Sequence, residues 1–405
     1  MTGSLSTPAS DGSDASGGSG GSDGSGASDG PLAPLSVTGR LDRVRAALAA
    51  LDDEPRPDAL LVTTPANLRW LTGFSGSAGV LVVGPDRAVL ATDGRYRTQA
   101  AEQLAASGAA DQVGLTIGGV RDQREALVAG AVGATAVGLE AGDVTWSAAR
   151  TWEGLLEPLP VVATLGVVEA LRMVKDADEV ARMEQAAAIA DAALGSVLHL
   201  LAEVRDGREL SESAFAAALD HAMRLGGAED RAFETIVASG ENSAKPHARP
   251  GSRVIRVGDA VVVDFGATFD GYRSDMTRTF CVGGQPTGEL ATVFEVVAAA
   301  QAAGVALVAP GVVTGDVDKA CRDRIAEAGW AERFEHGTGH GVGLDIHEGP
   351  AVGAGSTAIL QPGTVVTVEP GVYLPALGGV RIEDTLVVTP TGSRPLTRFP
   401  KEVAV

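Results

Sequence analysis

Apolar and polar positions follow two different patterns along the chain, and the first pattern covers residues 39–169. Short apolar runs bounded by Gly, Pro or Asp are typical of strands, and longer runs with apolar residues every three or four positions are typical of helices. We predict strands at residues 59–62, 79–83, 88–91 and 136–139, and helices at residues 44–51, 96–106, 122–132 and 146–155. This alternation predicts an α/β domain.

The second pattern begins with a helix-capping signal at Asp176. Its carboxylate can accept hydrogen bonds from the following backbone amides, and Glu179 three residues later can reach back. Apolar residues at helical spacing continue to Leu201. The rest of this pattern predicts helices at residues 211–225, 290–308 and 317–328, a strand-rich stretch at 236–282 and strands from residue 363 onward. Helices followed by strand pairs predict an α+β domain over residues 170–405.

The first 38 residues consist mainly of Gly, Ser, Asp and Ala. A segment of this composition buries too little apolar surface to offset the entropy lost on ordering. We therefore expect residues 1–38 to form a disordered tail without chemistry.

Composition narrows the class of protein. A chain of 405 residues, 45% of them hydrophobic, has room for two cores. The formal charge of -20 and the aromatic content of 4% argue against nucleic acid as a partner. No uninterrupted apolar run reaches membrane-spanning length, and the N-terminus does not resemble a signal peptide, so we expect a soluble, cytoplasmic protein that does not bind membranes. Cys281 and Cys321 are too few for a disulfide framework, and we expect both to be reduced core residues.

The segment 260–281 predicts a β-hairpin that turns at Asp270-Gly271, because Asp-Gly is a strong two-residue turn signal. Residues whose numbers add up to 541 then lie opposite one another. Asp264 faces Thr277, and Asp275 becomes the diagonal neighbour of Asp264 on the same face. Diagonal Cβ atoms lie about 7 Å apart or less, a span that two carboxylates can bridge around a pair of cations.

Asp264 follows three consecutive valines, and a buried carboxylate in such surroundings needs a positive partner. For this hairpin alone, two interpretations remain open. The partner is either a metal ion or the guanidinium of Arg273 or Arg278.

Three of the six histidines, His336, His340 and His347, fall within twelve residues that are rich in glycine. Glycine lets the backbone approach a site closely, and clustered imidazoles suit metal ligation or acid/base chemistry. The pattern is not that of a zincin helix, because His347-Glu348 lacks the second histidine that such a motif requires.

Two further carboxylates occur in apolar strands. Glu369 ends the predicted strand 364–368, and Glu383 lies in the middle of the predicted strand 380–385, where Arg381 and Thr385 share its face. Four carboxylates with one imidazole form an oxygen-rich site that suits Mn²⁺ better than a closed thiolate zinc site.

These segments resemble the creatinase, prolidase and aminopeptidase P group of "pita-bread" metallopeptidases. The resemblance covers nearly everything after the tail, including a creatinase-like N-terminal domain similar at residues 67–74 and 92–96. In the C-terminal half it rests on these motifs: Asp264-Phe265-Gly266 with residues 271–279, Gly339-His340-Gly341 with His347-Glu348-Gly349-Pro350, Glu369-Pro370-Gly371, and Arg381-Ile382-Glu383-Asp384.

The resemblance implies two divalent metal ions, Mn²⁺ first and Co²⁺ or Zn²⁺ as alternatives. Asp275 and Glu383 would bridge them, Asp264 would bind one, and His340 and Glu369 would bind the other. Hydroxide held between the ions would attack the peptide carbonyl while Glu369 handles the proton.

The remaining site residues take their roles from the same resemblance. His247 would contact the substrate or relay a proton, and His347 would stabilise the carbonyl oxygen under attack. His336 would lie beside the substrate, and Arg381 would support the ligand carboxylates.

The implied activity is that of an Xaa-Pro aminopeptidase, which releases an N-terminal residue from a peptide with proline second. The alternatives are an Xaa-Pro dipeptidase (prolidase) and, more remotely, a pita-bread domain that binds peptides without cleaving them. The resemblance also implies a homodimer or homotetramer.

Overall fold

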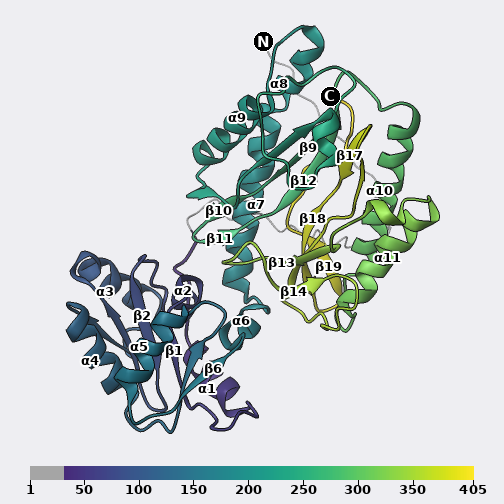
Figure 1. The fold of residues 1–405 in the computed structure, drawn as a ribbon. Coiled ribbons are helices and arrows are strands. Elements are labelled where there is room, and N and C mark those ends of the chain that lie inside the picture. The colour runs from purple at the N-terminus through teal and green to yellow at the C-terminus, as the bar shows by residue number, and fades with distance from the viewer. Residues whose placement is uncertain (1–31) are drawn as a thin grey trace, which may run out of the picture. The chain divides into compact units, whose positions relative to one another are not determined.

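The computed structural model describes residues 32–405 (Figure 1). Most of the predicted tail, residues 1–31, lies outside the described residues. Residues 32–38 of the predicted tail are described, and there Leu35 and Val37 are buried and the backbone amide of Val37 donates a hydrogen bond to the carbonyl of Ser107. These two apolar residues interrupt the polar composition and pack into the core of the N-terminal half.

A six-stranded mixed sheet with the order β4-β3-β2-β1-β5-β6 organises the N-terminal half. Alternate residues of β1 face opposite sides, so helices cover both faces (Figure 1): α1, α2 and α3 pack on one, α4 and α5 on the other. The elements are α1 (Arg40–Ala49), β1 (Ala59–Val62), α2 (Pro65–Thr72), β2 (Gly79–Val83), β3 (Ala88–Thr92), α3 (Arg97–Ala106), β4 (Val113–Ile117), α4 (Val120–Gly130), β5 (Val137–Glu140), α5 (Trp146–Leu156), β6 (Val161–Thr164) and α6 (Val167–Arg172).

The four strands predicted for this half are confirmed to within one residue at each end, and the four predicted helices are present. The sequence pattern missed β4 and β6, which are the two edge strands of the sheet and are only partly buried. It also missed the short helices α2 and α6. Edge strands bury little surface, and helices of 8 and 6 residues are too short to show a clear period, so both leave a weak periodic signal.

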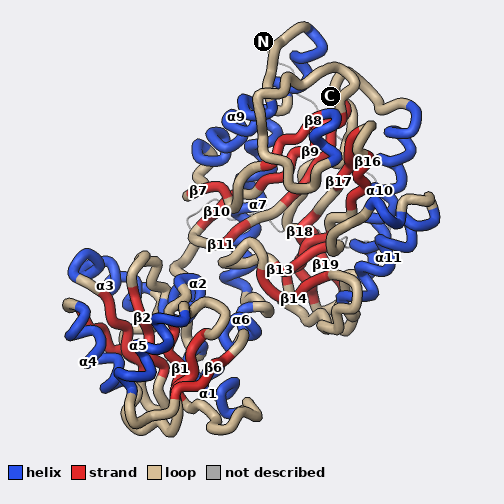
Figure 2. Tube along the Cα trace, viewed as in Figure 1, coloured by secondary structure: helices blue, strands red, loops and turns tan. Residues whose placement is uncertain are grey.

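Four main helices flank the strands of the C-terminal half, α7 and α9 on one side and α10 and α11 on the other (Figure 2). The predicted capping box at Asp176 and Glu179 is confirmed. The helices are α7 (Ala177–Val197), α8 (His199–Ala202), α9 (Glu212–Leu225), α10 (Gly288–Leu307) and α11 (Thr314–Glu327).

The strands of this half form four small sheets with the orders β12-β9-β8, β14-β13-β15-β18-β19, β11-β10-β7 and β16-β17. Their bounds are β7 (Asp230–Arg231), β8 (Ile236–Ser239), β9 (Ala260–Phe265), β10 (Ala267–Phe269), β11 (Tyr272–Arg273), β12 (Met276–Cys281), β13 (Gly339–Gly341), β14 (Glu348–Val352), β15 (Val365–Val368), β16 (Gly371–Leu374), β17 (Gly378–Arg381), β18 (Asp384–Thr389) and β19 (Gly392–Pro395).

The hairpin register predicted for residues 260–281 is confirmed. Asp264 of β9 pairs with Thr277 of β12, and Phe269 pairs with Tyr272 across the turn. Asp270 and Gly271 have φ values of 44° and 72°, as a type I′ turn requires. Asp275 lies in the short link between β11 and β12.

The prediction that Glu383 lies in the middle of one strand is wrong. β17 ends at Arg381 and pairs with β16, whereas β18 begins at Asp384 and pairs with β15. Glu383 lies in the break, where its backbone amide donates to the carbonyl of Thr277. The break arises because the chain passes from one sheet to another at this point, which an uninterrupted apolar pattern does not reveal.

Two described helical segments, Ala177–Asp206 and Gly288–Leu307, are long and apolar enough to span a membrane by length and composition alone. Each packs one side against strands of the core. A core helix passes the same test, so these segments are weak evidence for a membrane span. Cys281 and Cys321 are free and buried, as predicted.

Candidate active site and metal centre

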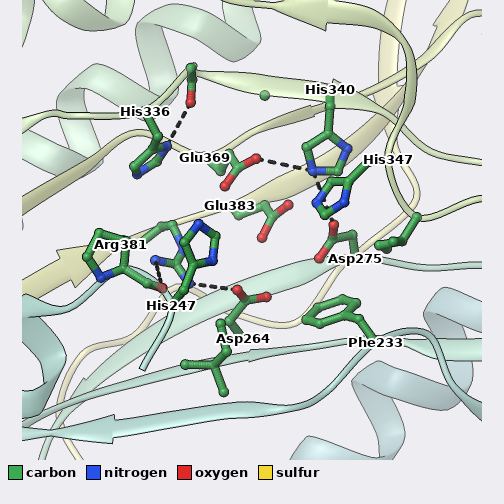
Figure 3. Close-up of a pocket in the computed structure, with 15 residues that line it drawn as sticks. Phe233, His247, Asp264, Asp275, His336, His340, His347, Glu369, Arg381 and Glu383 are labelled. Carbon is green, nitrogen blue, oxygen red and sulfur yellow. Dashed lines mark hydrogen bonds and ion pairs between the residues drawn. The ribbon is translucent and has the colours of Figure 1, made fainter. Parts of the chain in front are cut away.

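One cavity of about 240 Å³ brings together all nine site residues proposed from the sequence (Figure 3). They come from strands of the small sheets described above and from the links between those strands. The nine are His247, Asp264, Asp275, His336, His340, His347, Glu369, Arg381 and Glu383.

Three carboxylates converge in this cavity. Asp264, Asp275 and Glu383 each offer an oxygen within 4.8 Å of the other two. Burial, together with the negative charge of neighbouring carboxylates, raises the pKa values of Asp275 and Glu383 well above their ordinary values. Oδ1 of Asp264 is buried and has no hydrogen-bond partner among the described residues. A buried acceptor without a donor, beside two crowded carboxylates, fits a site for cations.

His340 presents an unprotonated nitrogen to the same cluster. Its Nδ1 lies 3.0 Å from the carbonyl oxygen of Gly341, and because a carbonyl can only accept, Nδ1 carries the hydrogen. Burial lowers the pKa of His340 to about 4, so the ring is neutral near pH 7. Nε2 therefore directs its lone pair toward Oε1 of Glu369 at 3.4 Å and Oδ2 of Asp275 at 3.6 Å. This is the orientation that a metal-binding imidazole adopts.

Glu369 follows directly after β15. Its backbone amide donates to the carbonyl of Thr338, and Oγ1 of Thr367 lies 3.2 Å from its Oε1. Burial raises the pKa of Glu369 to about 8. A carboxyl group whose pKa lies near neutrality can both accept and release a proton in a reaction.

Arg381 is the cationic partner of Asp264. Its Nη2 donates to Oδ2 of Asp264 at 2.6 Å, Nη1 donates to Oη of Tyr373 at 2.8 Å, and Nε donates to Oγ1 of Thr277 at 3.1 Å. Among the described residues that line the cavity, Arg381 is also the only Lys or Arg. One guanidinium leaves four neighbouring carboxylates undercompensated.

The alternative partners considered for Asp264 are wrong. Arg278 instead pairs with Asp384 at 2.8 Å. Arg273 donates through Nε to the carbonyl of Leu344. In the paired strands Arg278 lies opposite Val263 rather than Asp264. It therefore lies on the other side of the hairpin, which the alternation of side chains along a strand explains.

His336 has both ring nitrogens engaged. Nδ1 lies 2.8 Å from the carbonyl of Gly337, so it donates, and Nε2 therefore accepts from Oη of Tyr373 at 2.8 Å. Burial lowers the pKa of His336 to about 4. His336 thus forms a neutral wall of the cavity with no free hydrogen to donate.

His347 and His247 are exposed residues of the cavity lining. The ring of His347 contacts that of His340 edge to face, with 4.5 Å between the centroids. Exposed imidazoles at the edge of a cavity are available to a bound ligand.

Sequence reasoning missed two polar residues that support the site. Oγ1 of Thr277 donates to Oε2 of Glu383 at 2.7 Å, and the predicted register already placed Thr277 opposite Asp264. Tyr373 connects Arg381 to His336. No local pattern marks Tyr373, because its position depends on the pairing of β16 with β17.

A two-domain chain whose C-terminal half encloses a buried cluster of carboxylates and one neutral imidazole has the features of a metal-dependent hydrolase. Residues 181–390 match the family described as Metallopeptidase family M24, and residues 40–174 match the Creatinase/Prolidase N-terminal domain. The chain belongs to metallopeptidase family M24. The predicted pita-bread domain, preceded by a creatinase-like N-terminal domain, is confirmed.

Individual relatives support the same assignment. The chain is 40% identical over 348 residues to the uncharacterized peptidase YqhT of Bacillus subtilis, covering 86% of this chain and 96% of that one. The solved Xaa-Pro dipeptidase from Bacillus anthracis is similar with a TM-score of 0.82 and 36% identity, covering 91% of this chain and 100% of that one. The X-Pro aminopeptidase from Thermotoga maritima is similar with a TM-score of 0.78 and 31% identity, covering 90% and 100%.

Proposed function

We propose that this metallopeptidase is an Xaa-Pro aminopeptidase, which hydrolyses the bond between an N-terminal residue and a following proline. In this proposal residues 39–169 form the N-terminal domain and residues 170–405 the catalytic domain. The observation that carries the proposal is the single cavity lined by all nine candidate residues. The names of the similar solved proteins, an Xaa-Pro dipeptidase and an X-Pro aminopeptidase, support the substrate class.

The charge of the cavity favours an aminopeptidase over a dipeptidase. The C-terminal carboxylate of a dipeptide would lie close to the scissile bond and would need a cationic partner. Arg381 is the only Lys or Arg of the lining within residues 32–405, and its nitrogens donate to Asp264, Tyr373 and Thr277. A longer peptide has its carboxylate farther away and fits this lining better.

Two divalent cations would be held by Asp264, Asp275, His340, Glu369 and Glu383, and we expect Mn²⁺ to occupy the sites. Bound there, such cations supply Lewis acidity, which polarises a peptide carbonyl and lowers the pKa of water. The crowded carboxylates, the orphan Oδ1 of Asp264 and the lone pair on His340 Nε2 all fit them.

The side chains of the cavity transfer protons, donate hydrogen bonds and contact the substrate. Glu369 takes the proton of the attacking water and passes it to the departing amine. His347 donates a hydrogen bond to the carbonyl oxygen as negative charge develops on it. His247 contacts the substrate or relays a proton. The neutral ring of His336 shapes the wall against which the substrate lies.

A second candidate function is an Xaa-Pro dipeptidase, which the name of the Bacillus anthracis protein favours. A family member without catalysis is disfavoured, because all five candidate metal ligands are retained. We further propose that the protein acts in the cytoplasm. We also propose that it forms a homodimer or homotetramer, and light scattering would test this oligomeric state.

The test compares kcat/KM of the metal-loaded protein on an Xaa-Pro dipeptide, an Xaa-Pro-Yaa tripeptide and a longer peptide with proline second. A matched tripeptide with leucine second is the control. We expect the tripeptide and the longer peptide to be cleaved faster than the dipeptide, and the leucine control slowest. Faster cleavage of the dipeptide would establish the dipeptidase, and equal rates with proline and leucine would overturn the proline specificity.

A further inference from the structure

The segment 342–348 carries His347 to the cavity, yet no hydrogen bond of the imidazole itself holds it. Its ring contacts the ring of His340 edge to face. No hydrogen bond joins the His347 ring to another residue within the described range 32–405. The position of this imidazole therefore depends on how the backbone on either side is fixed.

Glu348, the next residue, is held by two cations that precede α7. Nζ of Lys175 donates to Oε1 of Glu348 at 2.6 Å, and Nη2 of Arg172 donates to Oε2 at 2.6 Å. The same Nη2 lies 2.7 Å from Oδ2 of Asp345. Arg172 thus joins two acids that stand on either side of His347. Its side chain is only 3% exposed and that of Glu348 only 7%, so water competes little with these charge-assisted bonds.

Arg172 is itself held from the sheet of the N-terminal half. Its Nη1 donates to Oδ1 of Asn67 at 2.7 Å, and Nδ2 of Asn67 donates to Oε1 of Glu140 at 2.7 Å. The other oxygen of Glu140 accepts from the backbone amides of Thr63 and Thr64. A continuous line of hydrogen bonds therefore runs from the ends of β1 and β5 to the segment that carries His347.

Close packing within the segment 342–348 also fixes its conformation. A Cβ atom on Gly343 would lie 2.5 Å from Oε1 of Glu348 and 2.9 Å from Oε2, so only glycine lets the carboxylate lie here. The backbone amide of Arg273 donates to the carbonyl of Gly343, and its Nε donates to the carbonyl of Leu344. The backbone before His347 is thus held by β11 and the residue after it by Arg172 and Lys175.

We propose that Arg172 is a positioning residue for His347, through which the N-terminal domain sets the geometry of the active site. Arg172 acts by joining Asp345 and Glu348, and Asn67 with Glu140 orients it. The inference rests on the proposed role of His347 in stabilising the carbonyl oxygen. A displacement of about 1 Å at a catalytic group costs about 100-fold in rate, so the effect falls mainly on kcat.

The first experiment compares Arg172→Gln with Arg40→Gln in the metal-saturated full-length protein. Arg40 is a matched control, because its side chain is also 3% exposed and pairs with Asp176 and Glu179 near the start of α7. It bonds no residue of the segment 342–348. We expect Arg172→Gln to lower kcat by at least about tenfold with KM changed less than about threefold. Arg40→Gln should lower the melting temperature while leaving kcat within about twofold.

The second experiment places Arg172→Gln in a His347→Ala background, which separates positioning from general destabilisation. If Arg172 acts through His347, its replacement there changes kcat by less than about twofold. An equal loss in both backgrounds, or a kcat for Arg172→Gln no lower than that of Arg40→Gln, would overturn the proposal.

A milder variant covers the case in which Arg172→Gln does not fold. The Asp345 side chain is 48% exposed, so Asp345→Asn leaves the core intact while removing one of the two acids that Arg172 joins. We expect about a threefold loss of kcat that disappears in the His347→Ala background, and no loss would contradict the proposal. All variants are assayed with the peptide that the wild type cleaves fastest, so a wrong substrate assignment leaves this test intact.

Discussion

Nε2 of His340 lies 3.4 Å from Oε1 of Glu369, and this nitrogen carries no hydrogen. The hydrogen of this imidazole is on Nδ1, which donates to the carbonyl of Gly341. Two acceptors that face one another in a buried site repel unless a proton or a metal cation lies between them. This relationship, repeated among Asp264, Asp275 and Glu383, is the basis of our claim that the site binds metal ions.

Replacing Glu383 by Gln should have opposite effects on activity and on the stability of the metal-free protein. The change removes one proposed ligand, and since even residues that support ligands contribute 10–100-fold, we expect kcat/KM to fall by more than about 100-fold. It also removes a carboxyl group whose ionisation is disfavoured by burial and by the neighbouring acids, so the melting temperature of the chelated protein near pH 8 should rise. Calorimetry with and without Mn²⁺ measures the second effect, and a lower melting temperature of the chelated variant would contradict it.

Arg381→Lys should weaken metal binding without unfolding the protein. Lysine keeps the charge but cannot donate to Asp264, Tyr373 and Thr277 together. We expect the affinity for Mn²⁺, measured by isothermal titration, to fall by about 10–100-fold. The control is Arg182→Lys, since Arg182 has an equally buried side chain and pairs with Asp270 outside the cavity lining. Equal affinities in the two variants would show that Arg381 does not support the site.

The stability of the chelated protein should fall as pH rises. The pKa of Glu369 is raised from 4.5 to about 8, and those of Asp275 and Glu383 are also raised. Between the ordinary pKa of 4.5 and the raised pKa of about 8, Glu369 keeps in the folded protein a proton that it has released in the unfolded chain. The stability is therefore lost as pH increases through the folded-state pKa. His336 and His340, whose pKa values are lowered from 6.5 to about 4, act in the opposite direction only below about pH 7. We therefore expect a lower melting temperature near pH 8.5 than near pH 7, and a larger stabilisation by Mn²⁺ near pH 8.5. A melting temperature that rises over this range would refute the prediction.

Gly266→Ala should disrupt the hairpin that carries Asp264 and Asp275. A Cβ atom at Gly266 would collide with the carbonyl oxygen of Ser274, a backbone atom that cannot move aside. Overpacking of this kind costs about 1–3 kcal/mol or more, and it should also lower the affinity for Mn²⁺. The control is Gly114→Ala in β4, where the nearest atom would lie 3.7 Å away. Thermal melts of both variants make the comparison, and equal melting temperatures would count against the close approach.

Local patterns predicted the parts of the structure that local physics determines. The capping box at Asp176 and the register that sets Asp264 opposite Thr277 both follow from a few neighbouring residues, and both are confirmed. The break at Glu383 was missed, because it depends on which sheet each half of a segment joins.

The site shows the same division. The resemblance named the nine residues that share one cavity. By contrast, Arg273 and Arg278 were chosen as alternative partners of Asp264 because they lie near it in the sequence. The actual partner is Arg381, 117 residues away. Tyr373 reaches the site only through the pairing of β16 with β17, a tertiary relationship that no short segment encodes.

The central claim is that five side chains hold two divalent cations. An anomalous difference map from crystals grown with Mn²⁺ tests it most directly. We predict two peaks, both enclosed by Asp264, Asp275, His340, Glu369 and Glu383, with His340 and Glu369 beside one and Asp264 beside the other. A map without a peak in this cavity, at a Mn²⁺ concentration that supports full activity, would contradict the claim.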